Sequence, residues 1–395
     1  MRISSLEING LTGRKKKFRA SFDDSINIIW GSNGSGKTTV LKIIHSAMTG
    51  ETAPLLRLSF TSAKIEFTDA NGRKIIRKIS RNESNRAALF DFTDSLDFES
   101  FTKDPDLERY ELFEDARTLR WSSEGSTGEV GYLSHRYLPI SRIFDFRNRH
   151  GRRHRGGLSE VLDEVEYDRV FAEQIQSLWS EFRSLALSHT RFAQQDAINR
   201  ILGAVLAGDD GRTSETESAQ VPIEDARRLV EDFFKANRGL GRHVKVDKVI
   251  SDYEVNPLMN RVVRTVSEVQ KQIELELAPE KRFTEVLNEL YAPNKSVDTS
   301  GPRRLSVTLR GTNHPIPIEG LSSGEKQVMR ILLETLVAGS SPVIVDEPEI
   351  SLHVDWHGYL LEKMNYINPD SQLIIASHSP EIVGALGKEG KLIEA

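Results

Sequence analysis

The chain has 395 residues, of which 38% are hydrophobic, and a formal net charge of -5 at pH 7. This length and apolar content allow two or three structural units with a real core. The sequence has no cysteine, which excludes disulfide bonds and cysteine-ligated metal and suits a reducing compartment. No apolar run approaches the ~18 residues of a membrane span, and the N-terminal segment lacks the apolar core of a secretory signal. We therefore expect a cytoplasmic protein without membrane association, and the negative charge argues against a uniformly basic nucleic-acid binder.

The first motif is the segment "GSNGSGKTT", which begins at Gly31. It matches the phosphate-loop pattern G-x-x-x-x-G-K-[ST], and it lies between a strand-like apolar run and helix-forming residues, as that pattern requires. Its backbone N–H groups are expected to form an anion-binding nest at a helix N-terminus. Lys37 would neutralise the β and γ phosphates of ATP, and the Thr38 hydroxyl would bind Mg²⁺. The predicted ATP-binding residues are Asn33, Gly34, Ser35, Gly36, Lys37, Thr38 and Thr39.

Short strands are expected around this loop over residues 1–80. Residues 63–68 and 73–79 alternate apolar and polar side chains on either side of Asn71-Gly72, which predicts a β-hairpin. The acidic stretch 90–114 is irregular, so no element is predicted there. The segment 208–220, "GDDGRTSETESAQ", has no apolar periodicity and is expected to be a mobile loop.

The middle of the chain is expected to be helical. One apolar stripe follows helical spacing and a second starts just after Pro257, while Pro222 stands where a further helix could begin. The stripes are short for a long coiled-coil arm, so an antiparallel helical lobe over about residues 155–295 is expected instead. The stripes consist of Phe171, Ile175, Leu178, Phe182, Leu185 and Phe192, and of Val262, Val266, Val269 and Ile273.

Strand patterns resume at Leu305 and are followed by "LSSGEKQ" and a helical stretch. The buried run 343–345 ends in Asp346-Glu347, and the next run, 373–376, is followed by Ser377-His378. A strand that ends in two carboxylates suits phosphate hydrolysis, because one can hold Mg²⁺ while its neighbour polarises the attacking water. We assign Asp346 to the metal and Glu347 as the general base.

Four motifs, "GSNGSGKTT", "LSSGE", "VIVDEPEISLH" and "ASHSP", occur in this order and resemble those of the ABC-type ATPases. The resemblance covers roughly residues 1–80 and 300–395 and points to the soluble branch with OLD-family, RecF-like and SMC-like proteins. It implies that His378 is the switch histidine and that ATP holds two heads together, as at least a dimer. It also implies that the signature residues of one protomer reach the γ-phosphate bound by Lys37 of another. These signature residues are Ser322, Ser323, Gly324 and Glu325.

Some positions depart from the commonest family pattern. Ser323 replaces the second signature glycine and Glu325 replaces the glutamine, as is frequent in the SMC-like branch. His353 stands where transporter-type heads often carry the D-loop aspartate. No Q-loop glutamine is assigned. The stretch "RYLPISRIFDF", 136–146, resembles a Leu-Pro-x-x-Arg segment of the defence ATPases of Septu and PARIS systems, and it is the candidate for that sensor position.

The fold class expected from these motifs is α/β: an ABC-type P-loop ATPase head, with a mixed sheet and an antiparallel β subdomain, plus an inserted α-helical lobe. The expected domains are the N-terminal part of the head (1–150), the helical insertion (151–299) and the C-terminal part of the head (300–395). Because the insertion separates the phosphate loop from the signature, nucleotide state is expected to move its base.

One basic stretch keeps several interpretations open. Residues 146–157, "FRNRHGRRHRGG", could contact nucleic-acid phosphate, bind an acidic partner or form a solvated linker. Its histidines do not indicate a metal site, because no cysteine or carboxylate accompanies them.

The leading functional expectation is an ATP- and Mg²⁺-dependent sensor or regulator of a prokaryotic anti-phage system, working as a homo-oligomer. In OLD-family proteins a nuclease domain follows the head, whereas only 15 residues follow Pro380 here, so an effector nuclease is expected in trans. Nucleic acid or a phage protein is a further possible partner. Two alternatives stay open: a RecF-like DNA-repair clamp, and a scaffold that uses ATP structurally.

Overall fold

A computed structural model describes residues 1–81, 119–124, 130–139, 164–206, 221–236, 245–253, 255–299, 301, 304–312, 314–386 and 390–395. Two compact units can be distinguished, and each is described by itself. The first comprises Met1–Leu178, Glu285–Asp298 and Leu305–Ala395, and the second comprises Trp179–Thr284 and Thr299–Arg304. The second unit thus begins at Trp179, later than the start expected at residue 151.

The first unit contains an antiparallel sheet in the order β2-β1-β4-β5-β6. Its strands are β1 (Arg2–Asn9), β2 (Phe18–Ser21), β4 (Ser62–Thr68), β5 (Lys74–Ser80) and β6 (Ser122–Ser123). The predicted hairpin is confirmed, since β4 and β5 pair from Thr68↔Lys74 to Ser62↔Ser80. Side chains of β4 alternate between buried and half-buried, because one face of the sheet covers the core and the other does not.

A second sheet of this unit is parallel and has the order β13-β3-β12-β11-β7. Its strands are β3 (Ile26–Trp30), β7 (Arg136–Leu138), β11 (Val343–Asp346), β12 (Leu373–Ser377) and β13 (Gly390–Glu394). The inner strands are mostly apolar because both of their faces are covered, and Asn27 of β3 is a buried polar exception. The parallel and antiparallel strands expected of the head are therefore present, but in separate sheets.

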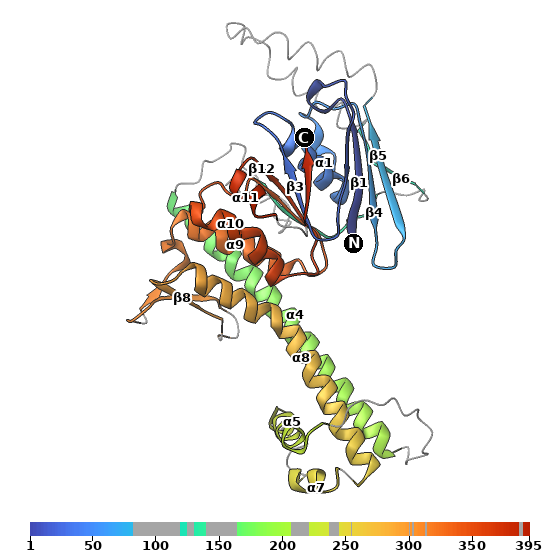
Figure 1. Cartoon of the computed structure of the whole chain (residues 1–395), viewed down its shortest axis with the longest axis vertical. Helices are drawn as coiled ribbons and strands as arrows, with labels where there is room; N and C mark the ends of the chain where they lie inside the picture. Colours follow the sequence, from blue (N-terminus) through green and yellow to red (C-terminus); the bar gives the residue numbers. More distant parts are fainter. Residues whose placement is uncertain are drawn as a thin grey trace, which may run out of the picture. The chain divides into compact units, whose positions relative to one another are not determined.

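Helix α1 (Lys37–Thr49) lies between the two sheets (Figure 1) and is buried against their apolar side chains. Its C-terminal end is fastened by Arg77 of β5, which is 3% exposed and donates to the carbonyl oxygens of Ala47 and Met48. A guanidinium suits this place because a helix C-terminus carries unpaired carbonyl groups and partial negative charge. The buried Gln372 also joins the sheets, since its side chain exchanges hydrogen bonds with the backbone of Ile3 at 2.8 Å.

The first unit also contains three helices, three 3-10 turns and a small third sheet among the described residues. Helices α9 (Ser323–Val337), α10 (Val354–Ile367) and α11 (Pro380–Gly384) belong to it, with the 3-10 turns η1 (Leu11–Gly13), η2 (Ala53–Leu55) and η3 (Ile318–Gly320). A small antiparallel sheet has the order β10-β9-β8, with β8 (Lys295–Asp298), β9 (Ser306–Leu309) and β10 (Pro315–Ile316). The strand expected from Leu305 onward is β9. The α/β class expected from the motifs is thus confirmed.

The second unit is built from two long antiparallel helices, α4 (Glu164–Leu206) and α8 (Pro257–Leu290). The first turns of α4 and the last turns of α8 belong to the first unit. Side-chain contacts show their direction, because Arg183 pairs with Glu280 at 2.5 Å and Nδ1 of His189 lies 3.1 Å from a carboxylate oxygen of Glu276. Helices α5 (Ile223–Ala236) and α7 (Val246–Ser251) pack near their far ends. The antiparallel arrangement agrees with expectation, but the helices form a long arm, which the sequence analysis had rejected.

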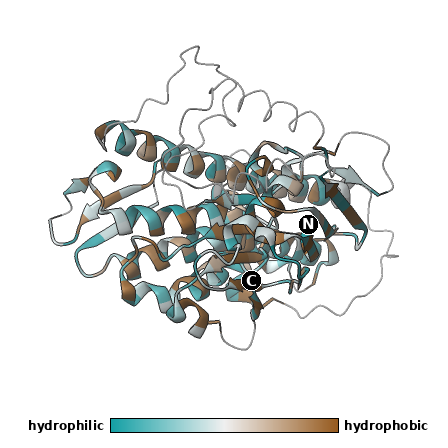
Figure 2. Ribbon diagram, turned by 90° about the horizontal axis from the view of Figure 1, so that it is seen from above, coloured by the Kyte–Doolittle hydropathy of each residue, from teal (hydrophilic) through white to brown (hydrophobic). Residues whose placement is uncertain are grey.

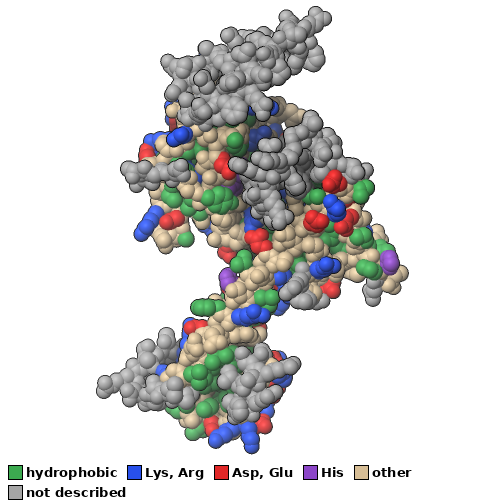
Figure 3. Space-filling model, turned by 180° about the vertical axis from the view of Figure 1, so that it is seen from behind, with side chains coloured by type: hydrophobic (Ala, Val, Ile, Leu, Met, Phe, Trp, Pro, Cys, Tyr) green, Lys and Arg blue, Asp and Glu red, His purple; other side chains and the backbone are tan. Residues whose placement is uncertain are grey.

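The reason for this error is visible along α4. Its predicted stripe is buried through Phe171, Ile175 and Leu178, but Leu185 and Phe192 are 53% and 77% exposed. Beyond Leu178 the helices are held partly by charged pairs, so apolar periodicity underestimates their contact. The second stripe is confirmed, with Val262, Val266 and Val269 buried. In Figure 2 the helices alternate between hydrophobic (brown) and hydrophilic (teal) stretches. In Figure 3 exposed hydrophobic side chains (green) are visible on the surface of the helical unit.

Three segments singled out in the sequence lie outside the described residues. They are the acidic stretch 90–114, the basic stretch 146–157 and the segment 208–220. Among the helices that the structure describes, none has the length and apolar character needed to cross a bilayer.

Candidate nucleotide-binding site

The predicted motifs meet at one edge of the parallel sheet. The phosphate loop follows β3, Asp346-Glu347 closes β11, and His378 follows β12. The register aligns these ends, because Ser377 pairs with Trp30 and Ala376 with Asp346. Carboxyl ends of parallel strands are where open α/β sheets bind ligands. These residues lie far apart in the sequence, and the strand order of the sheet brings them together.

The phosphate loop has the backbone that its glycines allow. Gly34 and Gly36 have φ of 78° and 104°, in the left-handed region that favours glycine. A Cβ on Gly36 would also approach Leu11 and Thr12 to 3.2 Å. Gly36 is the N-cap of α1, so the first N–H groups of the helix have no helical carbonyl partner. This geometry matches the anion nest expected from the sequence.

Lys37 lies over this loop. Its ammonium donates to the carbonyl oxygens of Gly31 at 2.9 Å and Ser32 at 3.2 Å, and the residue is 5% exposed. The buried Ser35 hydroxyl has no hydrogen-bond partner among the described residues. A buried polar group without a partner is costly, so its presence next to Lys37 is consistent with a ligand-binding loop. Asn33, Thr38 and Thr39 lie in or beside the same turn.

Asp346 is the most deeply buried charge of the site, with 3% of its surface exposed. Burial raises the pKa of its carboxyl group from 3.8 to about 6, against the lowering effects of the Thr38 hydroxyl and of Lys42 and Lys37. Within the described residues, neither carboxylate oxygen receives a hydrogen bond of normal geometry. An incompletely paired carboxylate beside a phosphate-loop hydroxyl is a donor set that suits Mg²⁺.

Glu347 and His378 are close neighbours at the sheet edge. The backbone of Glu347 has φ of 48°, which is uncommon for a residue with a side chain and is often associated with functional sites. Its N–H continues the ladder by donating to the carbonyl of Ala376 at 2.8 Å. The Glu347 carboxylate lies 3.5 Å from Nδ1 of His378. The pair predicted as general base and switch histidine is therefore assembled within one protomer.

Glu349 is a site residue that the sequence analysis missed. This buried carboxylate accepts hydrogen bonds from the Ser377 hydroxyl at 2.6 Å and from the backbone N–H of His378 at 3.1 Å. The same oxygen lies 3.4 Å from Nδ1 of His378. One oxygen of Glu349 thus contacts both the backbone and the ring of the histidine. The signal was the third carboxylate in "DEPE", two positions after Glu347, whose contact with residue 378 depends on the β11–β12 register.

The signature residues form the first turn of α9. Ser322 is the N-cap, and it exchanges hydrogen bonds with Glu325 in a capping box. Ser323 is exposed, whereas a Cβ on Gly324 would approach the carbonyl oxygen of Ser351 to 2.8 Å. Only glycine therefore lets this turn pack against the loop that follows β11. No hydrogen bond or ion pair between described residues joins the signature turn to the phosphate loop.

The Glu325 carboxylate is engaged within its own chain. Lys295 of β8 donates to both of its oxygens, at 2.7 and 2.6 Å, and Tyr291 donates to its backbone carbonyl at 2.9 Å. Burial alone would raise the pKa of Glu325, but the hydrogen bonds from Lys295 and from the Ser322 N–H lower it. Its side chain thus holds the signature turn together.

The signature turn is also bound to α4. Lys326, next to Glu325, pairs with Asp168 in the first turns of α4 at 2.7 Å, and both side chains are largely buried. Tyr291 and Lys295 follow the end of α8. The signature turn is therefore connected by buried contacts to both ends of the helical insertion.

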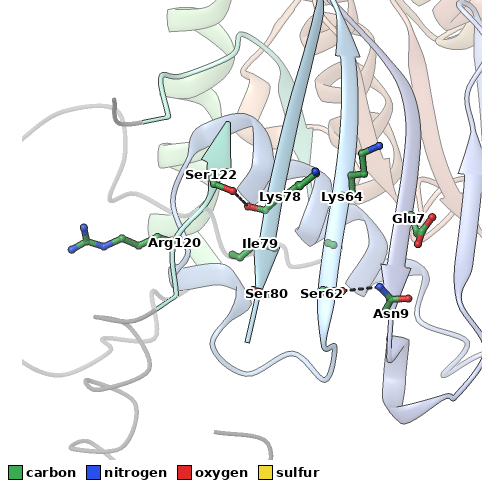
Figure 4. Close-up of a pocket in the computed structure, with 10 residues that line it drawn as sticks. Glu7, Asn9, Ser62, Lys64, Lys78, Ile79, Ser80, Arg120 and Ser122 are labelled. Atoms are coloured by element: carbon green, nitrogen blue, oxygen red, sulfur yellow. Dashed lines mark hydrogen bonds between the residues drawn. The ribbon is translucent and has the colours of Figure 1, made fainter. Parts of the chain in front are cut away.

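The structure also has a groove of about 400 Å³ on the outer face of the antiparallel sheet (Figure 4). Its lysines are already paired, Lys64 with Glu66 at 2.7 Å and Lys78 with Glu124. None of its lining residues belongs to the predicted site, and we assign it no part in nucleotide binding. It is lined by Glu7, Asn9, Ser62, Ala63, Lys64, Lys78, Ile79, Ser80, Arg120 and Ser122.

Known proteins similar to this chain include solved SMC heads. The Smc head domain with an extended coiled coil from Pyrococcus furiosus is 14% identical, with a TM-score of 0.41, over 97% of this chain and 91% of that chain. The SMC head domain from Thermotoga maritima is 10% identical, with a TM-score of 0.40, over 98% and 92%. Similarity at this level does not bear on function.

Two sequence comparisons are more specific. The "Retron Vc95 probable ATPase" of Vibrio cholerae serotype O1 biovar El Tor is 20% identical over 397 residues, which cover 95% of this chain and 70% of that protein. Neither it nor the structures above is named as a Septu or PARIS protein. A family model described as "AAA domain, putative AbiEii toxin, Type IV TA system" matches residues 26–384. This match spans nearly the whole chain, and the protein therefore belongs to that family of AAA-type ATPase domains.

Proposed function

We propose that this protein binds and hydrolyses ATP with Mg²⁺, and that its nucleotide state regulates a separate effector in prokaryotic defence. The observation that carries the ATPase proposal is the convergence of the phosphate loop, Asp346, Glu347 and His378 at one edge of the parallel sheet. A phosphate nest, a buried metal-type carboxylate and a second carboxylate near a histidine are the parts that phosphoryl transfer to water needs.

Each residue then has a distinct part. The N–H groups at the start of α1 bind phosphate oxygens, and Lys37 exchanges its loop carbonyl partners for the phosphates. Asp346 and Thr38 hold Mg²⁺, which supplies positive charge against the triphosphate when it is bound. Glu347 accepts a proton from the attacking water, and His378 is kept in place for the γ-phosphate by Glu349.

The first prediction separates binding from hydrolysis. Lys37→Ala should abolish ATP binding, because it removes the charge opposite the triphosphate. Glu347→Gln should retain binding and lower the rate of hydrolysis by at least about 100-fold, because the amide cannot accept the proton. Binding is measured by calorimetry and hydrolysis by phosphate release. Glu362→Gln, an exposed change on α10, is the matched control and should behave as wild type. An unchanged rate in the Glu347→Gln variant would show that Glu347 is not the base.

The second prediction uses the buried charge of Asp346. Its folded-state pKa, about 6, lies above the ordinary 3.8, so the folded protein binds this proton more tightly than the unfolded chain. Above pH 6 the carboxylate is ionised in both states and destabilises the metal-free fold by about 3 kcal/mol at most. This destabilisation decreases as the pH falls from 6 to 4. Asp346→Asn should therefore raise the free energy of unfolding at pH 7 by about 1–3 kcal/mol, with a smaller gain at pH 5.

Chemical denaturation in the presence of EDTA measures both values. The same variant should lose the additional stabilisation by ATP with Mg²⁺ that the wild type shows. A gain that grows toward acidic pH, or no gain at pH 7, would contradict this account of Asp346.

We further propose that two protomers share each ATP site, with Ser322, Ser323 and Gly324 of one facing the phosphates bound by the other. The exposed Ser323 and the absence of bonds from the signature turn to the phosphate loop, among described residues, support this arrangement. A closed dimer would then bring the signature turns toward nucleotide, and the contacts of Glu325 and Lys326 would pass that motion to α8 and α4.

The third prediction tests this shared site with paired heterodimers. Ser323→Glu adds charge at an exposed position without touching the capping box. A dimer with Lys37→Ala in one protomer and Ser323→Glu in the other should keep one intact site and about half of the wild-type activity. A dimer with both changes in one protomer beside a wild-type protomer should have none. Differently tagged copies allow each heterodimer to be purified before its ATPase rate is measured. The reverse pattern would show that each site lies within one protomer.

The proposal of a regulated effector rests on the family and on the relative. The family description names a toxin of a toxin–antitoxin system, and the relative is an ATPase of a retron. An effector nuclease on a separate chain, bound through the helical insertion, is the expected partner. A signature turn that pairs with Asp168 of α4 and with Lys295 of β8, the strand that follows α8, supports such coupling.

The fourth prediction is that the purified protein hydrolyses ATP without cleaving DNA or RNA, and forms a complex with the product of an adjacent reading frame. Co-expression and affinity purification in the presence of ATP measure complex formation, and the Lys37→Ala variant is the matched control. Loss of the complex on replacing α5 and α7 with a short linker would place the partner on the insertion. Nuclease activity of the pure protein alone would overturn the assignment to a separate chain.

A further inference from the structure

A second set of buried polar groups lies beside Asp346, on strand β7. Tyr137 of this strand is in register with Ile344 of β11. Residues two positions apart along a strand share a face, so Asp346 lies on the same face of the sheet as Ile344. Asp346 is two residues further along β11, at its carboxyl end. The Tyr137 hydroxyl is buried, and among the described residues it has no hydrogen-bond partner. The oxygens of Asp346 receive no hydrogen bond of normal geometry from described residues, although the nearby Thr38 hydroxyl lowers the pKa of this carboxyl group.

The ring of Tyr137 is held by α1. His45 of this helix stacks on it, with ring centroids 4.5 Å apart and an interplanar angle of 23°. His45 follows Thr38 by seven residues, which places both on one face of α1 almost two turns apart. The face of α1 that carries the predicted magnesium ligand Thr38 therefore also holds the Tyr137 ring.

His45 is in turn fixed by His135. Nδ1 of His135 lies 2.8 Å from the carbonyl oxygen of Leu133, so this nitrogen carries a hydrogen. Burial lowers the pKa of His135, so the ring is neutral and its Nε2 is an acceptor. Nδ1 of His45 lies 2.7 Å from that Nε2 and donates to it. Both rings are then neutral, in agreement with burial, which lowers the pKa of His45 to about 4. The pair thus acts as a rigid neutral support for Tyr137.

A hydroxyl and a carboxylate have complementary hydrogen-bonding character, since one donates and the other only accepts. The charge of Asp346 also acts on Tyr137, because it adds to the effect of burial in raising the pKa of the phenol. Metal ligands in proteins are oriented by such neighbouring donors, and the loss of one costs about 10- to 100-fold in metal affinity.

We propose that Tyr137 is a positioning residue for magnesium: in the nucleotide-bound protein its hydroxyl donates a hydrogen bond to Asp346 and keeps that carboxylate directed toward Thr38. This inference rests on the proposed ATPase function and adds a residue that the four motifs do not contain. It also gives a role to the start of the 136–146 stretch, of which residues 136–139 are described.

The test measures magnesium dependence without relying on turnover. The EDTA-treated protein is titrated with Mg²⁺ at fixed ATP, and thermal stabilisation is followed for the wild type and for Tyr137→Phe, which keeps the stacked ring and removes only the hydroxyl. The Mg²⁺ concentration for half-maximal stabilisation should rise about 10-fold, whereas the affinity for ATP in EDTA should be unchanged. A merely structural role would weaken both.

Tyr132→Phe is the matched control, because Tyr132 is exposed and its ring lies 5.7 Å from that of His135 without reaching the site. Its Mg²⁺ midpoint should stay within about twofold of the wild type. If Tyr137→Phe behaves like Tyr132→Phe while the wild type responds to Mg²⁺, this inference is overturned and the proposed function stands. If the wild type shows no stabilisation by ATP with Mg²⁺, the proposed function fails, and the inference fails with it.

Discussion

The buried charge of Asp346 is the constraint around which the site of this protein is organised. A carboxylate that is 3% exposed and lacks hydrogen-bond donors of normal geometry among the described residues makes the fold less stable than a neutral side chain would. The fold holds it there because β11 is an inner strand of the parallel sheet, with β12 and β7 on either side. Asp346 lies beside Thr38 and near Lys37, so a magnesium-bound triphosphate at this place would reduce the destabilisation caused by its buried charge.

Several features that seem unrelated follow from this placement. Arg77 secures the far end of α1, so the helix presents its N-terminus rigidly to the same edge of the sheet. Glu347 has a left-handed backbone, and its own carboxylate lies near the ring of His378. Glu349 accepts a hydrogen bond from the backbone N–H of His378. The left-handed backbone of Glu347 and the incompletely paired carboxylate of Asp346 thus stand next to each other at the predicted site.

The signature turn extends this site toward the rest of the molecule. Its ion pair with Lys295 and the Lys326–Asp168 pair are largely buried contacts within the first unit, so they are stronger than exposed pairs. They give a physical path by which nucleotide could bias the insertion. A DNA clamp receives no corresponding support from the groove on the antiparallel sheet, whose lysines Lys64 and Lys78 are paired with carboxylates. The basic stretch 146–157 lies outside the described residues, so that interpretation stays open.

The sequence by itself determined the local elements and the chemistry that each carries. Glycine spacing, a run of buried residues and the turn at Asn71-Gly72 act over a few residues, so the phosphate loop, β11 and the β4–β5 hairpin could be predicted. Local signals could not show that the aliphatic periodicity of α4 gives way to pairs such as Arg183–Glu280, because an ion pair between distant residues leaves no periodic trace. Tertiary structure alone decided the strand order. That order places Glu349 against His378, and it places Tyr137 on the strand next to that of Asp346, in register with Ile344. Which strands are neighbours in a parallel sheet depends on packing between segments hundreds of residues apart and not on their proximity in the sequence.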